Sequence, residues 1–366
     1  MYSLRIITFD SPGLKNDAET YKKVFEQNNY SVDIAILYSD NQSIIQPKYD
    51  INLFLERISP KKFKTVFPST LNLLMPNQEI FGSYDELKYM DYILCKSEAA
   101  RSFFEYMKKE KNYKYICFYT KFTTNIPESL KHIELHKNVN LFVHLAGKSS
   151  FKNTDSLIYC WLTNNGFLDI DPEIELYVTC YKNCFKQMKD NLKKYFKYNT
   201  NYFSGPQNDV IRIKNMVFYT THAPLDEYNK MLTSANVALC ISSKEGFGHY
   251  INEARFFETF VVILDAEPMN ELVIDNVNGL VIKDPTLLEK DLSQHTSYKM
   301  YSAYPKIEDL KKAIIYCIKN KKELHTMGKN GRKMFINDEK FFIKTMTEII
   351  LNDLNNNISV VNRINI

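Results

Sequence analysis

Glycine, tryptophan and long hydrophobic runs are scarce in this chain. Only 10 of its 366 residues are glycine, and one is tryptophan. Nowhere do eighteen apolar residues follow one another, so we expect no transmembrane helix. The apolar run in residues 1–9 is too short and too β-branched for a signal peptide. We therefore predict a cytoplasmic protein, for which peripheral contact with a membrane remains open.

The chain also lacks a disulfide pattern, a metal-binding pattern and a strong net charge. Its seven cysteines are odd in number and form no Cys-x-x-Cys pair, which is typical of reduced thiols. Cys180 and Cys184 have a spacing that would suit one helix face, but no nearby histidine joins them, so we predict no metal site there. The net charge of +4 is small and the lysines are spread along the chain. There is therefore no clear signal for nucleic-acid binding.

The chain does contain a repeated alternation of strand and helix patterns. Short, β-branched apolar runs are separated by amphipathic stretches, which is typical of βαβ units with a parallel sheet. A first set of predicted strands comprises residues 4–9, 32–37, 51–58, 71–75, 92–95 and 115–119. A second set comprises residues 141–146, 175–179, 216–220, 237–241, 260–264 and 280–282. Predicted helices lie at residues 18–27, 98–109, 154–162, 225–232, 249–257 and 307–319.

Two doubly wound α/β sheets in tandem, each Rossmann-like, are the predicted fold class. We expect an N-terminal domain at residues 1–135 and a second domain at residues 136–338, connected through the polar segment 128–138. A last helix in residues 339–366 is expected to pack back toward the N-terminal domain and to end in a frayed tail. Ligands bind outside the carboxyl ends of the strands in such sheets, so a cleft between the two sheets would hold the ligand.

Two of the few glycines flank one phenylalanine in the stretch "SSKEGFGHYINEA", which follows a predicted strand. Gly246 and Gly248 would let the backbone approach a ligand closely. The helix that follows would present unpaired N–H groups to an anion such as a phosphate. A carboxylate accepts two hydrogen bonds side by side, which suits a ribose diol, and Glu245 and Glu253 lie on either side of the turn. The alternative is an exposed loop before a helix whose acidic residues complement its dipole.

Residues 242–282 resemble the donor-binding signature of the GT-B glycosyltransferases of the retaining family 4. That signature has a glutamate, Gly-Phe-Gly, a second glutamate, a buried strand, an acidic turn, Glu-x-Val and a glycine. The matching residues here are Glu245, Gly246, Phe247, Gly248, Glu253, Asp265, Glu271, Val273 and Gly279. Glu258 and Phe260 depart from it, because the family has glycine and proline there, and His249 replaces an apolar residue. The resemblance implies the GT-B fold.

The resemblance also implies roles for residues of the second domain. A basic pair in the family holds the donor diphosphate, and Lys148 and Lys152 stand at that place, four positions apart where the family often has five. Lys148 and Glu245 are the predicted catalytic residues: the lysine would compensate the charge on the leaving diphosphate, and the glutamate would hold the sugar with the 246–248 backbone. Glu253 would hold the ribose. The other predicted donor-binding residues are Thr221 and His222, which border the nucleobase, and Phe247 and His249. His249 would meet the donor sugar or phosphate, or it simply opens the helix.

Three residues of the first domain are expected near the ligands. Gly13 lies in "FDSPGLKND", where the family has a glycine-containing loop close to the donor phosphates. Asn77 and Glu79 lie in "LLMPNQEIF", where family members often carry an acceptor-side segment with a histidine. Glu79 would orient an acceptor hydroxyl, or it is an acidic residue at the start of a helix. Both interpretations stay open.

These inferences predict a glycosyltransferase that moves a sugar from a UDP- or GDP-linked donor to a hydroxyl acceptor such as a glycan or glycoprotein. Retention of anomeric configuration is implied by the resemblance alone. Asp169-Ile170-Asp171 spells the metal-binding triplet of the other large glycosyltransferase fold, but it precedes a predicted strand instead of following one. We therefore predict neither a metal nor another cofactor. The alternatives are a sugar-nucleotide epimerase or hydrolase on the same fold, and a non-catalytic or nucleic-acid-associated binding module.

Overall fold

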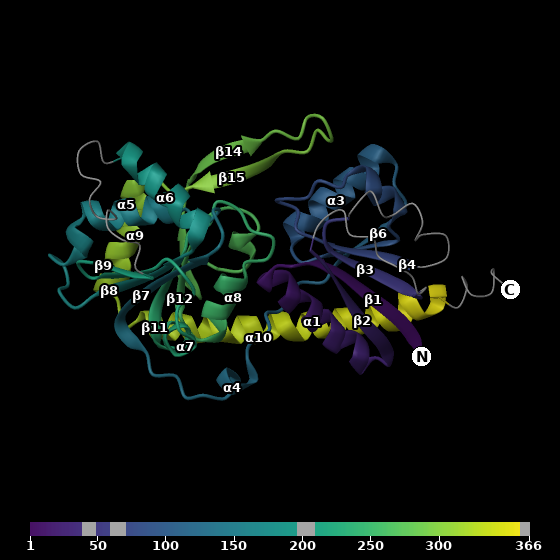
Figure 1. Cartoon of the computed structure of the whole chain (residues 1–366), viewed down its shortest axis with the longest axis horizontal. Helices are drawn as coiled ribbons and strands as arrows, with labels where there is room; N and C mark the ends of the chain where they lie inside the picture. The colour runs from purple at the N-terminus through teal and green to yellow at the C-terminus, as the bar shows by residue number, and fades with distance from the viewer. Residues whose placement is uncertain (39–48, 59–70, 196–208, 359–366) are drawn as a thin grey trace. The chain divides into compact units, whose positions relative to one another are not determined.

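The computed structural model describes residues 1–38, 49–58, 71–195 and 209–358 of the chain (Figure 1). The chain divides into two compact units. Unit 1 comprises Met1–Pro127, Lys290–Met300 and Ile336–Ile366, and unit 2 comprises Glu128–Glu289 and Tyr301–Phe335. Each unit is built on a parallel sheet of its own, so each is described by itself.

Unit 1 contains a six-stranded sheet whose strands pair in parallel in the order β2-β1-β3-β4-β5-β6. The strands are β1 (Tyr2–Phe9), β2 (Tyr30–Leu37), β3 (Ile51–Glu56), β4 (Leu71–Pro76), β5 (Tyr92–Cys95) and β6 (Ile116–Tyr119). β4 is buried throughout, and β3 is buried except at its last residue. Continuous burial of this kind is expected of parallel strands that are covered on both faces.

The helices of unit 1 begin at caps that are visible in the sequence. α1 (Pro12–Gln27) starts with proline, and the Ser11 hydroxyl accepts a hydrogen bond from the N–H of Leu14. Ser97 caps α3 (Glu98–Lys111) in the same way, and that helix ends at Asn112 in a left-handed conformation. A short 3₁₀ helix, η1 (Asp85–Tyr89), lies between β4 and β5.

Unit 2 contains a seven-stranded sheet in the order β13-β12-β11-β7-β8-β10-β9, in which only the β9–β10 pair is antiparallel among the described strands. The strands are β7 (Asn138–Gly147), β8 (Glu175–Cys180), β9 (Val210–Ile213), β10 (Met216–Tyr219), β11 (Ala235–Cys240), β12 (Phe260–Leu264) and β13 (Gly279–Ile282). A separate hairpin is formed by β14 (Thr286–Lys290) and β15 (Met300–Tyr304). The helices are α4 (Glu128–Lys131), α5 (Thr154–Thr163), η2 (Asn165–Phe167), α6 (Lys182–Tyr195), α7 (Leu225–Ser234), α8 (His249–Phe256), η4 (Met269–Glu271) and α9 (Ile307–Lys319).

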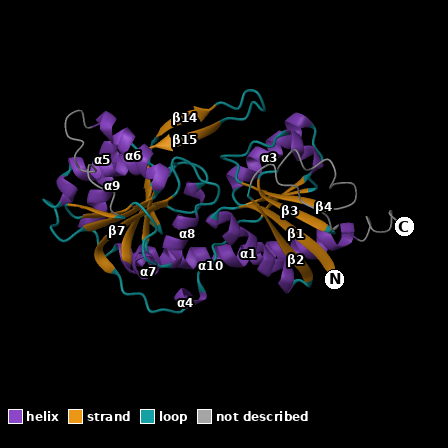
Figure 2. Cartoon of the chain, viewed as in Figure 1, coloured by secondary structure: helices purple, strands orange, loops and turns teal. Residues whose placement is uncertain are grey.

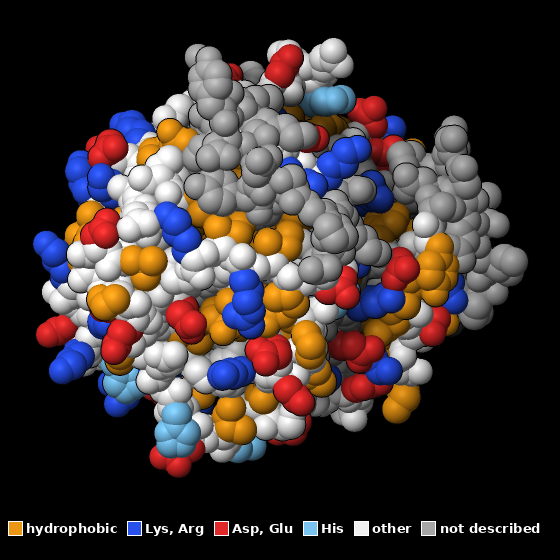
Figure 3. Space-filling model, turned by 60° about the vertical axis from the view of Figure 1, so that its left-hand side comes forward, with side chains coloured by type: hydrophobic (Ala, Val, Ile, Leu, Met, Phe, Trp, Pro, Cys, Tyr) orange, Lys and Arg blue, Asp and Glu red, His pale blue; other side chains and the backbone are white. Residues whose placement is uncertain are grey.

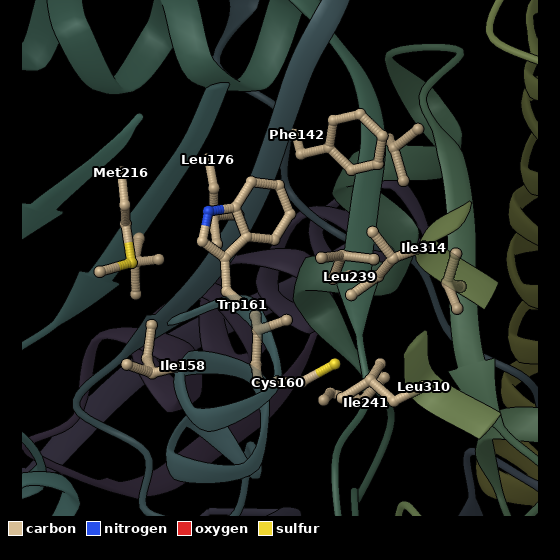
Figure 4. Packing of buried hydrophobic residues seen from close by; sticks show 14 of the residues in the cluster. Phe142, Ile158, Cys160, Trp161, Leu176, Met216, Leu239, Ile241, Leu310 and Ile314 are labelled. Atoms are coloured by element: carbon tan, nitrogen blue, oxygen red, sulfur yellow. The ribbon is translucent and has the colours of Figure 1, made fainter. Parts of the chain in front are cut away.

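Helices cover both faces of the unit 2 sheet, and successive strand residues point to opposite faces (Figure 2). On one face Trp161 of α5 packs against Phe142 of β7, with ring centroids 6.0 Å apart, inside a cluster that also includes residues of α6 and α9 (Figure 4). On the other face Val143, the next residue of β7, packs in a cluster with Ile251 of α8 and Met231 of α7. This double layer fixes α8 against one face of the sheet.

The last long helix, α10 (Leu324–Ile349), contributes to both units. Its residues up to Phe335 belong to unit 2, where the Phe335 ring packs on Phe256 with centroids 5.6 Å apart. Its residues from Ile336 onward belong to unit 1, where the Phe342 ring packs on Phe122 with centroids 5.0 Å apart. A π-helical turn, η5 (Ile350–Leu354), follows.

The predicted fold class is confirmed, because both units are built on parallel α/β sheets. The sequence prediction missed α6, β9, the β14–β15 hairpin and the first half of α10. Within the described ranges, no helix is long and apolar enough to cross a membrane. On the face shown in Figure 3, basic and acidic side chains are interspersed, with no large field of one sign. The predicted domain boundaries, at residues 1–135, 136–338 and 339–366, stay a prediction.

His144 is a buried polar residue in the middle of β7. Its Nδ1 lies 2.7 Å from the carbonyl oxygen of Leu239, which can only accept, so Nδ1 carries the proton. Its Nε2 lies 2.9 Å from the hydroxyl oxygen of Thr154, and as the unprotonated nitrogen it accepts that hydrogen bond. Burial, together with the nearby charge of Lys152, lowers the pKa of His144 to about 4. The ring is therefore neutral in the folded protein at neutral pH.

Acid is expected to destabilise the fold through His144. The unfolded chain binds the proton first as pH falls from 6.5 to 4, because the pKa is depressed only in the folded protein. The stability that neutral His144 contributes is complete above pH 6.5 and is lost progressively down to pH 4, by up to about 3 kcal/mol. Urea unfolding of the wild type and His144→Gln across this range measures the effect. Glutamine keeps a donor and an acceptor but does not titrate, so equal pH slopes for the two proteins would exclude His144 as the cause.

Candidate functional site

Unit 2 has a topological switch point between β7 and β11. From β7 the chain continues to β8 on one side, whereas β11, on the other side of β7, comes later in the chain. Ligands bind outside the carboxyl ends of the strands at such a point, because the following loops diverge there. The loop after β7 carries Lys148 and Lys152, and the loop after β11 carries residues 241–248. The fold therefore brings the two predicted motifs to one edge of the sheet.

Hydrogen bonds hold these two loops together. The Asn153 side chain donates to the carbonyl oxygen of Ile241 at 2.8 Å, and the Ser243 N–H donates to that of Phe151 at 2.7 Å. Gly147 has a positive φ of 59°, a conformation that glycine adopts with little strain. Lys148, the next residue, is exposed. Its ammonium group is therefore accessible to an anionic ligand at the switch point.

Lys152 and Glu245 form an ion pair at the centre of this edge. The Lys152 ammonium donates to the Glu245 carboxylate, and each side chain is 11% exposed. The same carboxylate oxygen accepts a hydrogen bond from the Ser242 hydroxyl, which also lies within hydrogen-bond distance of the Tyr250 hydroxyl. Lys152 Nζ lies 3.6 Å from the centroid of the Tyr250 ring, a cation–π contact. Ser242 and Tyr250, which sequence reasoning did not single out, thus connect the two predicted residues.

The Gly-Phe-Gly turn leads directly into α8. Gly248 precedes the first helical residue with a left-handed φ of 82°, and a β-carbon there would lie 3.0 Å from Ile251 Cδ1. Because glycine brings no side chain to cap α8, the first N–H groups of the helix can meet a ligand. Gly246 and Phe247 are buried, and Phe247 packs against His249, the first residue of α8, with ring centroids 5.4 Å apart. The turn is thus fixed by packing, and its helix dipole favours an anion.

Glu253 lies one turn further along α8 and is half-buried. Burial raises the pKa of its carboxyl group, and the charges of His249 and Lys152 partly offset that rise. The charge of Glu253 in turn raises the pKa of the Tyr228 hydroxyl. In the part of the chain that the structure describes, the Glu253 carboxylate accepts no hydrogen bond. It can therefore accept hydrogen bonds from a ligand.

Thr221 and His222 follow β10, at the same edge of the sheet but two strands away from β7. His222 is exposed, and its ring lies 4.7 Å from that of Tyr181, measured between centroids. Tyr181 directly follows β8, the strand between them. The structure therefore brings Lys148, Lys152, Glu245, the 246–249 turn, Glu253, Thr221 and His222 to one edge of unit 2.

The three predicted residues of the first domain lie in unit 1, where the structure changes two expectations. Gly13 lies in the first turn of α1 and not in a loop, because Ser11 caps the helix one residue before Pro12. A β-carbon at Gly13 would meet no atom within 4 Å, so that turn is open. Asn77 follows β4 and donates to Glu56 Oε2 at 3.2 Å. Glu79 lies in a turn, so the interpretation as a helix-start residue is wrong.

Two candidate metal sequences take other roles. Asp169 and Asp171 lie in a turn before β8, where Asp171 pairs with Lys321 and Asp169 accepts from Asn165. Cys180 ends β8 whereas Cys184 lies in α6, so the two do not share a helix face. Within the described ranges, no group of three His, Cys, Asp or Glu side chains could hold a metal ion. Metal independence stays a prediction.

Comparison with known families identifies the region around this site. Residues 209–298 match the family model of "Glycosyl transferases group 1". The chain carries a group 1 glycosyltransferase domain. The match includes the Gly-Phe-Gly turn and Glu253 but does not reach the sheet of unit 1, so the predicted family resemblance is confirmed on the donor-side motif. A comparison with curated protein sequences finds no match.

Solved structures resemble this chain over nearly its whole length. The sucrose-phosphate synthase of Thermosynechococcus elongatus aligns with a TM-score of 0.65 and 12% identity, over 95% of this chain and 98% of that one. A glycosyltransferase from Rickettsia africae aligns with a TM-score of 0.61 and 12% identity, over 96% and 99%. The Anabaena protein HepE, in complex with UDP, aligns with a TM-score of 0.57 and 12% identity, over 97% and 100%. At such identities the likeness shows the fold, which is GT-B.

Proposed function

We propose that this chain transfers a sugar from a nucleotide-sugar donor, UDP- or GDP-linked, to a hydroxyl group of an acceptor, with retention of configuration. One observation carries the proposal. An accessible lysine, an uncapped helix N-terminus and a carboxylate open to a ligand converge at the switch point of unit 2. The resemblance of HepE, whose structures contain UDP and UDP-glucose, supports UDP as the first nucleotide to test.

Each group has a role that its chemistry fits. Glu253 would accept hydrogen bonds from the ribose diol, since two carboxylate oxygens match two adjacent hydroxyls. Lys148 would bind the diphosphate together with the first N–H groups of α8. Glu245 and the 246–248 backbone would hold the sugar. Thr221 and His222 would border the base, two strands further along the same edge.

Lys152 would serve the diphosphate less directly than Lys148. Its ammonium already compensates Glu245, and the pair has a low exposure that strengthens their attraction. A lysine ammonium is a compact charge without the fixed planar geometry of a guanidinium. The Lys152 ammonium can therefore move between the Glu245 carboxylate and the diphosphate at a small cost in free energy. We therefore assign Lys148 the larger share of the charge on the leaving diphosphate. Together these cations would take the place of a metal ion.

Nucleotide binding tests the proposal. At a ligand concentration about a hundredfold above its Kd, the bound nucleotide adds roughly 2.7 kcal/mol to the free energy of unfolding. Thermal shifts with UDP, GDP, ADP and their sugars would reveal the preferred base. Folded protein that shows no shift with any of them would refute the proposal. Consumption of donor without a glycosylated product would favour the epimerase or hydrolase alternative.

Glu253→Gln is expected to weaken nucleotide binding about tenfold or more while changing kcat less. An amide retains one acceptor oxygen, and a hydrogen bond to a charged group is worth about 1.5–3 kcal/mol. Kd and kcat for the donor and its 2′-deoxyribose analogue would be measured in both proteins. The exposed Glu175→Gln, at the start of β8, is the matched control. An unchanged preference for ribose over deoxyribose in the variant would show that Glu253 is not the ribose ligand.

Tyr250 offers a paired test of how Lys152 is held. Tyr250→Phe removes only the hydroxyl that contacts Ser242, whereas Tyr250→Leu also removes the ring under the ammonium. A desolvated cation–π contact is worth up to about 2 kcal/mol, so the leucine variant is expected to lose up to about thirtyfold in kcat/KM and the phenylalanine variant only a few fold. Steady-state kinetics of both variants checks the order. Equal losses would mean that the hydroxyl, and not the ring, positions Lys152.

A further inference from the structure

The sheet of unit 1 has a topological switch point of its own, between β1 and β3. From β1 the chain passes to β2 on one side, and β3 lies on the other side of β1. The carboxyl end of β1 leads into the first turn of α1, where Gly13 leaves open space. The carboxyl end of β3 is Glu56. The loops after β1 and β3 diverge at this switch point, as the loops after β7 and β11 do in unit 2. A ligand of unit 1 is therefore expected at the carboxyl ends of β1 and β3.

Glu56 has an unusual backbone conformation for its residue type. Its φ is +71°, in the left-handed region that side chains with a β-carbon rarely adopt. A glycine at this position would avoid the strain. Strained residues of this kind cluster at ligand-binding sites, where surrounding contacts hold a side chain in a required direction. At Glu56, a hydrogen bond from Asn77 holds the side chain.

Among the described residues, the Glu56 carboxylate is held on one side only. Asn77, which follows the neighbouring strand β4, donates to Oε2 at 3.2 Å. Across the part of the chain that the structure describes, no hydrogen bond reaches Oε1. The side chain is half-buried, and burial raises the pKa of its carboxyl group, an effect that Asn77 partly offsets. A half-buried carboxylate oxygen without a donor is suited to accept a hydrogen bond from a ligand.

The charges near Glu56 indicate which ligand fits. Lys96 and Asp17 are within electrostatic reach, but they form a pair 3.4 Å apart whose side chains are both 2% exposed, so they largely neutralise each other. The Arg57 guanidinium, which lies over the Phe9 ring 4.2 Å from its centroid, attracts the Glu56 carboxylate and offsets its charge. With these charges paired, Glu56 offers an acceptor oxygen to a hydroxyl donor, and the described groups around it leave no net positive charge to attract a phosphate or a carboxylate. The nucleotide-sugar donor of the proposed reaction carries an anionic diphosphate. The substrate that suits this edge of the unit 1 sheet is therefore the acceptor.

We infer that Glu56, held by Asn77, binds a hydroxyl group of the acceptor, and that the acceptor is a neutral polyhydroxylated molecule such as a sugar. This inference rests on the proposed function, because it names the second substrate of the same reaction. Glu56 Oε1 accepts the hydrogen bond from the acceptor hydroxyl, and Asn77 is a positioning residue that fixes the carboxylate. Glu79, the acceptor-side residue expected from the sequence, lies in the turn that follows Asn77.

Calorimetric titration of the whole chain at saturating UDP tests the inference. The neutral probes are the methyl α-glycosides of glucose, mannose and galactose, and the anionic probe is glucose 6-phosphate. At least one neutral glycoside is expected to bind more tightly than glucose 6-phosphate. Glu56→Gln is expected to raise the Kd of that glycoside about tenfold and to leave the Kd of UDP unchanged. The matched control is Glu19→Gln, an exposed glutamate of α1 in the same unit, which should change neither constant.

Glu56→Asp is a second variant that keeps the test valid if Glu56→Gln does not fold. Aspartate tolerates the left-handed conformation and keeps the charge, but its shorter chain retracts the carboxylate, so glycoside affinity should lie between that of the wild type and Glu56→Gln. Wild-type binding in both Glu56 variants, binding of glucose 6-phosphate alone, or binding of no neutral glycoside would each overturn the inference. The proposed function fails separately, when none of UDP, GDP, ADP and their sugars binds, and glycoside titrations without nucleotide still report on Glu56 in that case.

Discussion

Replacing Lys148 with alanine is expected to lower the kcat of the best nucleotide-sugar donor by about 10²- to 10³-fold, with a much smaller change in the Kd of UDP. Lys148 is exposed beside the switch point, whereas the Lys152 ammonium is paired with Glu245. Negative charge on the diphosphate grows as the sugar leaves, so a fixed cation there stabilises the transition state more than the bound donor. Steady-state kinetics and calorimetry on the same preparations measure the two constants.

Lys322→Ala is the matched control for Lys148→Ala. Lys322 is exposed. The carbonyl oxygen of its neighbour Lys321 accepts a hydrogen bond from the Asn236 side chain at the start of β11. Lys322 therefore lies near the amino ends of the strands, at the edge of the unit 2 sheet opposite to Lys148. It should leave both constants unchanged. Wild-type turnover that EDTA abolishes and Mn²⁺ restores would contradict the account, because it would show that a metal carries the charge assigned to the lysines. In that case Asp169 and Asp171 would have to be tested as ligands.

The proposed donor-binding edge of the unit 2 sheet, at the carboxyl ends of β7 and β11, could be predicted from the sequence because the motifs that mark it are local. The Gly-Phe-Gly turn stands between a predicted strand and a predicted helix, and both elements form where expected, as β11 and α8. Strand alternation then places Lys148 at the end of another parallel strand. In parallel sheets those ends share one edge, so neighbouring strands bring distant segments together. Even the departure at Glu258 is visible in the structure, as a left-handed φ of 59° after α8.

The contacts within that edge could not be predicted, because they depend on side chains from distant segments. The sequence assigned Lys152 to the diphosphate and Glu245 to the sugar, yet the structure joins the two through one hydrogen bond. Tyr250 was not singled out from the sequence, and its contact with Lys152 joins residues 98 positions apart. Such pairings follow from the strand order, which alternation alone does not specify.

Glu56 was hidden by a misplaced strand end. The apolar run suggested a strand over residues 51–58, which put Glu56 inside it, whereas β3 ends at Glu56 itself. The left-handed φ of Glu56 ends the extended conformation there, and no propensity scale indicates it for glutamate. The β14–β15 hairpin was missed for another reason. Leu287 and Leu288 are both exposed, so β14 has no alternation between buried and exposed residues to detect.

Two glycines of α10, Gly328 and Gly331, are expected to respond to alanine with opposite signs. A β-carbon at Gly328 would lie 2.0 Å from the carbonyl oxygen of Glu258, so α10 or the turn after α8 must move. Overpacking against a backbone carbonyl is expected to cost about 4 kcal/mol of unfolding free energy, at the upper end for single substitutions. A β-carbon at Gly331 would make only ordinary contacts, 3.7 Å from Arg255 Cγ. Gly331→Ala should therefore gain up to about 1 kcal/mol from helix propensity. Urea unfolding measures both.

The Gly328 contact also connects stability to the site. Glu258 lies directly after α8, the helix that carries Glu253, and its carboxylate pairs with Arg332 of α10 at 3.3 Å. Displacing that turn would shift the end of α8, so Gly328→Ala should weaken nucleotide binding in the fraction that remains folded, whereas Gly331→Ala should not. Similar unfolding free energies for the two variants would show that α10 does not pack tightly against the turn. A destabilised Gly328→Ala protein with wild-type affinity for UDP would instead show that α8 is held by the sheet alone.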